Sequence, residues 1–208
     1  MLLTFAIISS LSILIPFLVG LKFHKSFRSN TSKTFFAFIV LTTITEIINS
    51  SFCFLVVNNI WLNNLYVFVP LITFQIILFS EKKYSIKTAY LFNVLFVSLY
   101  IAGALNIVDI FKFNSINYVI SSLILVVICS ILLFGVFDND KIIEHSFVFG
   151  VSSGMLLYAS TTLVLYGLIN NLMASEKQFL WFYTLPQTII NIFVNIVFAK
   201  ALYGTNEK

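Results

Sequence analysis

The chain has 208 residues, of which 60% are hydrophobic and 10% charged, and its mean hydropathy is +1.02. Soluble domains carry about a quarter charged residues, so this composition excludes one. The net charge of +4 does not indicate nucleic-acid binding, because the basic residues fall in loops between apolar runs, where they set orientation and contact anionic lipid. At about 20 residues per crossing, the length predicts an all-α, integral membrane bundle of seven transmembrane helices in one domain (1–208).

Seven apolar runs predict the transmembrane helices in chain order. The first, 2–21, begins without a basic segment and shows no small-residue cleavage site, so we expect a retained helix, with a kink at Pro16. The others are expected at 35–57, 64–79, 88–105, 115–136, 145–169 and 179–201. The two cysteines, Cys53 and Cys129, fall in different helices within the hydrocarbon, so no disulfide is expected.

The placement of Lys and Arg predicts how the helices are oriented. With the N-terminus outside and the C-terminus in the cytoplasm, ten of the twelve basic residues lie on the cytoplasmic side and only Lys112 and Lys177 lie outside. An excess of Lys and Arg in cytoplasmic loops is the usual asymmetry of membrane proteins. We therefore expect a multi-pass protein of the cell's inner (cytoplasmic) membrane.

An internal similarity divides the chain into two units. Matching positions 112 residues apart are Ile8-Ser9-Ser10-Leu11 with Ile120-Ser121-Ser122-Leu123, Phe35 with Phe147, and Asn58-Asn59 with Asn170-Asn171. With four more residues inserted, Pro70 and Gln75 match Pro186 and Asn191. Two interpretations stay open. One is a pair of parallel three-helix repeats (1–80 and 115–203) joined by a linker helix (88–105). The other is chance in a chain rich in Ile, Phe, Ser and Asn.

This layout of three helices, one linker and three helices resembles the SWEET-type sugar facilitators and related vitamin transporters. The resemblance covers topology along the whole chain rather than motif. The PQ-loop relatives carry a Pro-Gln pair in the first helix of each repeat, whereas Pro186-Gln187 stands in the last helix of the second unit. The chain also looks like small seven-helix bacterial membrane proteins, through its Ser/Gly-rich sixth helix and polar seventh helix. The first resemblance implies a solute site between two units, and the second implies no activity.

The second helix carries a narrow polar line at helical spacing, formed by Thr42, Glu46, Asn49 and Cys53. Glu46 is the one carboxylate expected deep in the bilayer, at the midpoint of its helix. Placing a charge there costs from about 2.5 kcal/mol upward, so it should face protein or a water-filled cavity. The predicted helix interiors contain no Lys, Arg or His to balance it. Two states stay open: a protonated acid bonded to an amide such as Asn191, or a carboxylate balanced by a moving proton, a sodium ion or a cationic ligand.

The seventh helix offers the expected partner surface for Glu46, because Gln187, Asn191 and Asn195 share one of its faces. The alternative is that such amides only join helices, each hydrogen bond contributing about 0.6 kcal/mol. Gly150 and Gly154 have the GxxxG spacing, for which close helix packing is a sufficient explanation. The predicted binding residues are Glu46, Asn49, Gln75, Gln187, Asn191 and Asn195.

Enzyme chemistry is not expected, because no nucleophile motif, paired intramembrane acid or metal-type histidine cluster is present in the sequence, and no cofactor is predicted. The first hypothesis is a transporter of a small polar or cationic solute, coupled to an ion through Glu46. The second is a sensory subunit that binds a ligand and signals through a cytoplasmic partner protein. The third is a membrane scaffold. In each case the lipid bilayer is the surrounding medium.

Overall fold

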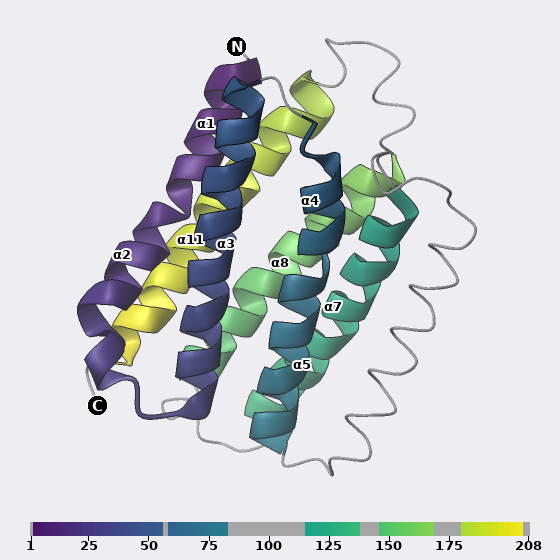
Figure 1. Cartoon of the computed structure of the whole chain (residues 1–208). Coiled ribbons are helices and arrows are strands. Elements are labelled where there is room, and N and C mark those ends of the chain that lie inside the picture. Colours follow the sequence, from purple (N-terminus) through teal and green to yellow (C-terminus); the bar gives the residue numbers. More distant parts are fainter. Residues whose placement is uncertain (1, 56–57, 83–114, 138–145, 169–179, 206–208) are drawn as a thin grey trace.

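The computed structural model describes residues 2–55, 58–82, 115–137, 146–168 and 180–205, and all regular structure in these ranges is helical (Figure 1). The elements are α1 (Leu2–Ser12), α2 (Leu14–Phe23), η1 (His24–Ser26), α3 (Asn30–Phe54), α4 (Ile60–Tyr66), α5 (Phe68–Lys82), α7 (Ser115–Phe137), α8 (Ser146–Gly167), η2 (Leu180–Thr184) and α11 (Leu185–Gly204). The helix expected over 88–105 lies outside the described residues, so a count of seven stays a prediction.

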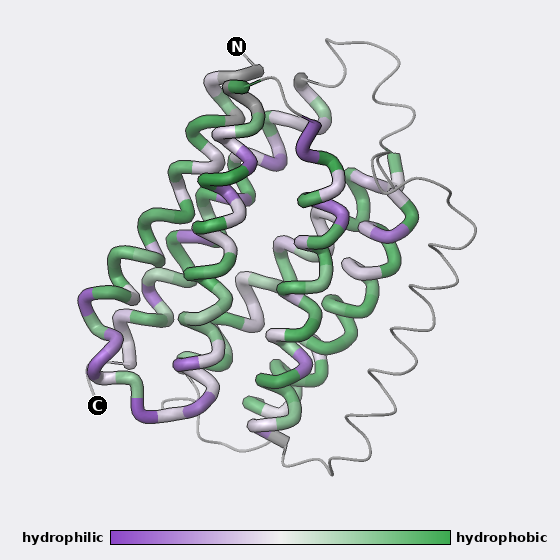
Figure 2. Tube along the Cα trace, in the orientation of Figure 1, coloured by the Kyte–Doolittle hydropathy of each residue, from purple (hydrophilic) through white to green (hydrophobic). Residues whose placement is uncertain are grey.

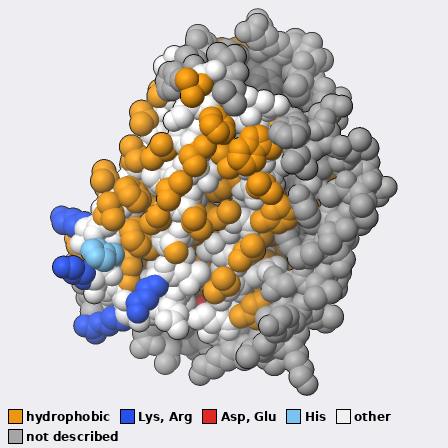
Figure 3. All heavy atoms as spheres, viewed as in Figure 1, with side chains coloured by type: hydrophobic (Ala, Val, Ile, Leu, Met, Phe, Trp, Pro, Cys, Tyr) orange, Lys and Arg blue, Asp and Glu red, His pale blue; other side chains and the backbone are white. Residues whose placement is uncertain are grey.

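Six stretches of the described chain are long and apolar enough to cross a membrane: Ile7–Ser26, Asn30–Phe52, Ile60–Glu81, Ser115–Phe137, Phe147–Gly167 and Trp181–Gly204. The side chains are distributed accordingly. Leu18 and Phe134 are 61% and 68% exposed, whereas Ser152 is fully buried. Apolar side chains are spread over the described part of the visible surface between the ends of the bundle (Figure 3), and the helices are apolar along most of their length (Figure 2). Such an exterior supports a multi-pass membrane protein, because apolar side chains face lipid and each helix satisfies its own backbone hydrogen bonds there.

The basic residues gather at one end of the bundle (Figure 3). Every Lys and Arg in the described ranges belongs to this basic end, where α2, α5 and α11 finish and α3 begins: Lys22, Lys25, Arg28, Lys33, Lys82 and Lys200. The segregation predicted from the sequence is therefore present in these ranges. The predicted outside residues, Lys112 and Lys177, lie outside the described residues.

Side-chain contacts fix the helix directions. Contacts join the start of one helix to the end of its neighbour: Thr31–Glu81 and Asn49–Asn63 for α3 against α4 and α5, Tyr118–Tyr166 and Phe137–Phe149 for α7 against α8, and Gly150–Ala201 for α8 against α11. Phe35 and Phe147 pack together near the starts of α3 and α8, so these two helices are parallel. It follows that α5 and α7 run in the same direction, toward the basic end.

Each described spanning helix packs against two neighbours, so that together they form a closed ring. The continuous pair α1–α2 packs on α11, α11 on α8, α8 on α7, α7 on α5, α5 on α3, and α3 again on α1–α2 (Figure 1). The ring holds a core of buried aromatic and aliphatic side chains toward the basic end. Polar side chains from several helices meet above this core.

Each of the three prolines coincides with a break in a spanning helix. The helix is interrupted at Ile13 before Pro16, at Val67 before Pro70, and by the π-helical turn η2 before Pro186. Proline has no N–H to donate and its ring clashes with the carbonyl four residues earlier, so the turn before it is distorted. A kink is expected at Pro16, and the structure shows the helix interrupted at Ile13, three residues before it.

Two helices begin earlier than their apolar runs suggest. The α3 helix starts at Asn30 instead of 35, because the Ser29 hydroxyl accepts the Ser32 backbone N–H at 3.1 Å and caps the first turn. The α4 helix starts at Ile60 instead of 64, with the Asn58 side-chain oxygen accepting the Ile60 N–H at 2.9 Å. Polar residues expected in loops therefore extend the helices.

The earlier start of α3 corrects the predicted position of Glu46 along its helix, which was the midpoint. The apolar span of α3 runs from Asn30 to Phe52, so its centre lies five residues before Glu46. At 1.5 Å per residue, the carboxylate-bearing position is about 7–8 Å from the centre, toward the end of the bundle opposite the basic end. It remains within the apolar span.

The α8 and α11 helices pack closely, as the glycine spacing predicts. A Cβ added to Gly154 would lie 2.8 Å from Cε1 of Phe198, and one on Gly150 would lie 3.1 Å from the Ala201 Cβ. An added side chain at either position would therefore require a shift of Phe198 or of Ala201 on α11. This close approach brings Phe198 and the polar residues above it to the middle of the bundle.

Candidate functional site

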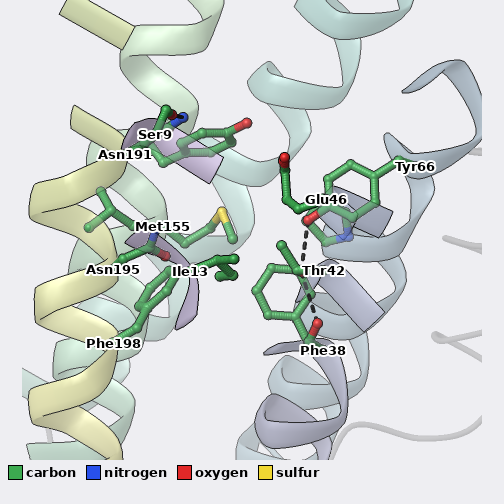
Figure 4. A pocket seen from close by; sticks show the side chains of 13 residues that line it. Ser9, Ile13, Phe38, Thr42, Glu46, Tyr66, Met155, Asn191, Asn195 and Phe198 are labelled. Atoms are coloured by element: carbon green, nitrogen blue, oxygen red, sulfur yellow. Dashed lines mark hydrogen bonds between the residues drawn. The ribbon is translucent and has the colours of Figure 1, made fainter. Parts of the chain in front are cut away.

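A cavity of about 80 Å³ lies between α1–α2, α3, α4–α5, α8 and α11 (Figure 4). Its polar lining consists of Ser9, Thr42, Glu46, Tyr66, Tyr158, Asn191 and Asn195. Its apolar lining consists of Ile13, Phe38, Pro70, Met155, Val194 and Phe198. Roughly 10–15 Å³ accommodates one water molecule, so the cavity has room for a few waters or one small cation.

Glu46 is half-buried in the cavity wall and accepts a hydrogen bond from a residue of α1. The Ser10 hydroxyl donates a hydrogen bond of 2.9 Å to Oε2 of Glu46. Among the described residues, Ser10 is the one hydrogen-bond donor to this carboxyl group. Because every described Lys and Arg lies at the basic end, none of them balances its charge.

Thr42 and Tyr66 place a second oxygen beside Glu46 (Figure 4). The Thr42 hydroxyl donates to the Phe38 carbonyl at 2.9 Å and lies 2.8 Å from the Tyr66 hydroxyl. Either hydroxyl can be the donor of the second bond. The Tyr66 hydroxyl therefore lies beside Thr42 in the cavity lining.

On the opposite wall, α11 is joined to α1 by two amides. The Asn191 Nδ2 donates to Oγ of Ser9 and the Asn195 Nδ2 donates to Oγ of Ser12, each at 2.7 Å. The Ser12 hydroxyl in turn donates to the Ser9 carbonyl at 2.6 Å. One N–H of each amide is therefore directed at α1.

The predicted partner of Glu46 is corrected by these contacts. One of the two states left open for the acid has it bonded to an amide such as Asn191, but Asn191 bonds to Ser9, and the acid bonds to Ser10 on the same helix. The reason is the rotation of α1, which presents adjacent serines to two different helices. The sequence did contain a signal, since Ser9-Ser10 is a polar pair within an apolar run.

The six predicted binding residues are only partly brought together. Glu46, Asn191 and Asn195 line the same cavity. Gln187 lies one turn from Asn191 and donates to its Oδ1 at 3.3 Å, outside the cavity lining. Asn49 donates to the Asn63 Oδ1 at 2.7 Å and joins α3 to α4. Gln75 is 3% exposed and is likewise absent from the lining.

Tyr66 and Tyr158 are lining residues that the sequence does not single out as a site. Tyr66 falls in a segment expected to begin a helix, and Tyr158 is one of many hydroxyl residues of α8. Cys53, the last residue of the predicted polar line, has a side chain outside the described set. In the described ranges, no group of three or more His, Cys, Asp or Glu side chains could hold a metal ion.

Aromatic rings close the cavity toward the basic end. Phe35 is fully buried, and its ring centroid lies 5.0 Å from that of Phe198, 5.8 Å from that of Phe147 and 6.4 Å from that of Phe74. Phe38 packs on the same cluster, with its centroid 6.3 Å from that of Phe74. The structure therefore has a polar cavity separated from the basic end by a layer of phenyl rings.

Comparison of the chain with protein-family models, curated proteins and solved structures gives no significant match. The function is therefore argued from the geometry of the cavity.

Proposed function

We propose that the protein binds a small cation in the central cavity and carries it across the bilayer, with Glu46 as the cation-binding carboxylate. The observation that carries the proposal is a carboxyl group in the lining of a polar cavity, with no described basic side chain near it. Among the described residues, its oxygens accept a hydrogen bond from Ser10 alone, while Asn191 and Asn195 on the opposite wall bond to serines of α1. An acid inside a membrane that pairs with no basic side chain is a functional group by default.

We also propose that the chain crosses the membrane a seventh time, between α5 and α7. The parallel directions of α5 and α7 support it, because a chain that leaves one end of the bundle and re-enters at the other must cross once between them. The basic end then lies in the cytoplasm by the positive-inside rule, the N-terminus lies outside, and the membrane is the inner one. The phenyl layer separates the cation site from the cytoplasm.

The order of the ring supports two parallel repeats. Exchanging α1–α2 with α7, α3 with α8, and α5 with α11 leaves every packing pair of the ring a packing pair. Phe35 and Phe147, which match in the sequence, also contact each other, as equivalent residues do near a twofold axis. Many transporters place their site between two such units, which agrees with the SWEET-like layout.

The test is uptake into liposomes that contain the purified protein, using radioactive sodium and radioactive tetramethylammonium under an inside-negative potential. Glu46→Gln should abolish the uptake of whichever cation enters. Glu81→Gln is the matched control, because Glu81 is a carboxylate at the basic end, bonded to Thr31, and should transport normally. Uptake that survives in Glu46→Gln would overturn the proposal. Saturable binding without uptake would instead favour a receptor that signals through a partner protein.

A further inference from the structure

Glu46 faces a second space besides the central cavity. A groove of about 270 Å³ lies between α1–α2 and α3, and it is lined by Ile7, Ser10, Leu11, Ile13, Leu14, Thr43, Glu46, Ile47, Ser50 and Ser51. Leu11 and Ile47 on its two sides are 56% and 58% exposed. These side chains belong to the apolar outer surface, so the groove opens sideways into the bilayer rather than to either end.

The groove and the cavity are neighbours with a shared wall. Glu46 and Ile13 line both spaces, whereas Ser9 lines only the cavity and Ser10 only the groove. The hydrogen bond from Ser10 to Glu46 therefore spans the boundary between them. A ligand in the groove can reach the carboxylate without passing through the phenyl layer.

Glu46 is the one ionisable group in the groove lining, to which Ser10, Thr43, Ser50 and Ser51 add hydroxyls. The hydroxyls of Thr43 and Ser51 donate to the carbonyls of Ile39 and Ile47 at 2.8 Å, within their own helix. Ser10 is already bonded to the acid. No Lys, Arg or His is among the lining residues. The groove therefore complements a ligand that carries one positive charge on an apolar body.

We propose that the groove is a lateral access route for an amphiphilic amine, whose ammonium head reaches Glu46 from the bilayer while its alkyl tail lies between α1 and α3. The proposal rests on cation binding at Glu46 and names the class of cation. The groove offers the tail little gain over lipid, since both are apolar. Its role is to let a molecule that is already concentrated in the bilayer bring its charge to the acid, which a strongly hydrated ion cannot do by this route.

The experiment measures binding of radiolabelled N,N-dimethyldecylamine to the protein in lipid nanodiscs, with empty nanodiscs subtracted. Decanol is the neutral counterpart, and tetramethylammonium is the hydrophilic cation. Ile47→Trp and Leu11→Trp, made separately, fill the groove from its two sides. Ile44→Trp is the matched control, because Ile44 is 48% exposed on the same helix but does not line the groove.

We expect specific binding of the amine that Glu46→Gln abolishes and that each groove-filling variant weakens by about tenfold or more, equivalent to about 1.4 kcal/mol. Ile44→Trp should bind the amine normally, and decanol should show no dependence on Glu46. Amine binding that is lost in Glu46→Gln but unchanged in both groove-filling variants would overturn the lateral route and leave the cation site standing. Binding of the amine that survives in Glu46→Gln would overturn both proposals.

Discussion

The hydrogen bond between Ser10 and Glu46 can report the charge of the acid. Ser10→Ala removes a donor 2.9 Å from Oε2 of Glu46, and its cost depends on whether that oxygen is neutral or ionised. Side-chain hydrogen bonds between membrane helices average about 0.6 kcal/mol and reach about 1.7. Hydrogen bonds to charged groups contribute about 1.5–3 kcal/mol. Because no described basic side chain lies near Glu46, we expect the acid to be neutral before a cation is added.

The assay introduces Ser10→Ala into three backgrounds and measures the free energy of unfolding by reversible denaturation with SDS in mixed micelles. The Glu46→Gln side chain accepts the same bond but cannot be ionised, and the Glu46→Leu side chain accepts none. We expect Ser10→Ala to cost about 0.6 kcal/mol in both the wild type and Glu46→Gln, and nothing in Glu46→Leu. The double-mutant comparison isolates this one contact.

Two results would refute the reasoning. A cost in the wild type that exceeds the cost in Glu46→Gln by more than about 1 kcal/mol would identify an ionised acid before cation binding. Equal costs in all three backgrounds would mean that Ser10 and Glu46 do not interact, and that α1 is rotated differently against α3.

Three further predictions concern the packing around the cavity. Gly154→Ala should destabilise the fold by about 1–3 kcal/mol through overpacking against α11, whereas Gly167→Ala, which meets nothing within 4 Å, should be close to neutral in the same SDS titration. Asn195→Ala should cost about 0.6 kcal/mol, and this cost should vanish when its serine partner on α1 is already alanine; an undiminished cost would exclude the bond. Phe35→Ala should cost about 3–5 kcal/mol and raise uncoupled cation leakage in the liposome assay, whereas Phe134→Ala on the lipid-facing surface should do neither. A stable, non-leaking Phe35→Ala protein would exclude the phenyl layer as the barrier.

The membrane-crossing stretches could be predicted because amino-acid composition alone indicates them. In lipid each backbone polar group must bond within its own helix, so a long apolar run predicts a helix with little regard to its neighbours. The helix ends were less predictable. Ser29 caps the first turn of α3 and the Asn58 side chain accepts the first N–H of α4, but a hydropathy pattern counts both residues as loop. Proline was informative at Pro16, where a kink was expected, whereas the breaks before Pro70 and Pro186 were not predicted, although they follow from the same missing N–H.

The site was predictable in its residue types but not in its pairings. Glu46, Asn191 and Asn195 are polar groups in apolar helices, and the structure places all three around one cavity. Their partners depend on how each helix is rotated about its axis. That rotation is set by packing between nearly uniform apolar surfaces, so the sequence gives little information on it. The pairing of Glu46 with Ser10 rather than with Asn191 is the clearest instance.

The central claim is that Glu46 exchanges a cation inside the membrane, and infrared difference spectroscopy on cation addition tests it most directly. The protein in lipid films is exposed to sodium or to tetramethylammonium, and the spectrum of the cation-free state is subtracted. We predict loss of the band of a protonated carboxyl group and gain of carboxylate bands, abolished in Glu46→Gln and retained in Glu81→Gln. A difference spectrum without carboxyl bands for both cations, or one that persists in Glu46→Gln, would contradict the account.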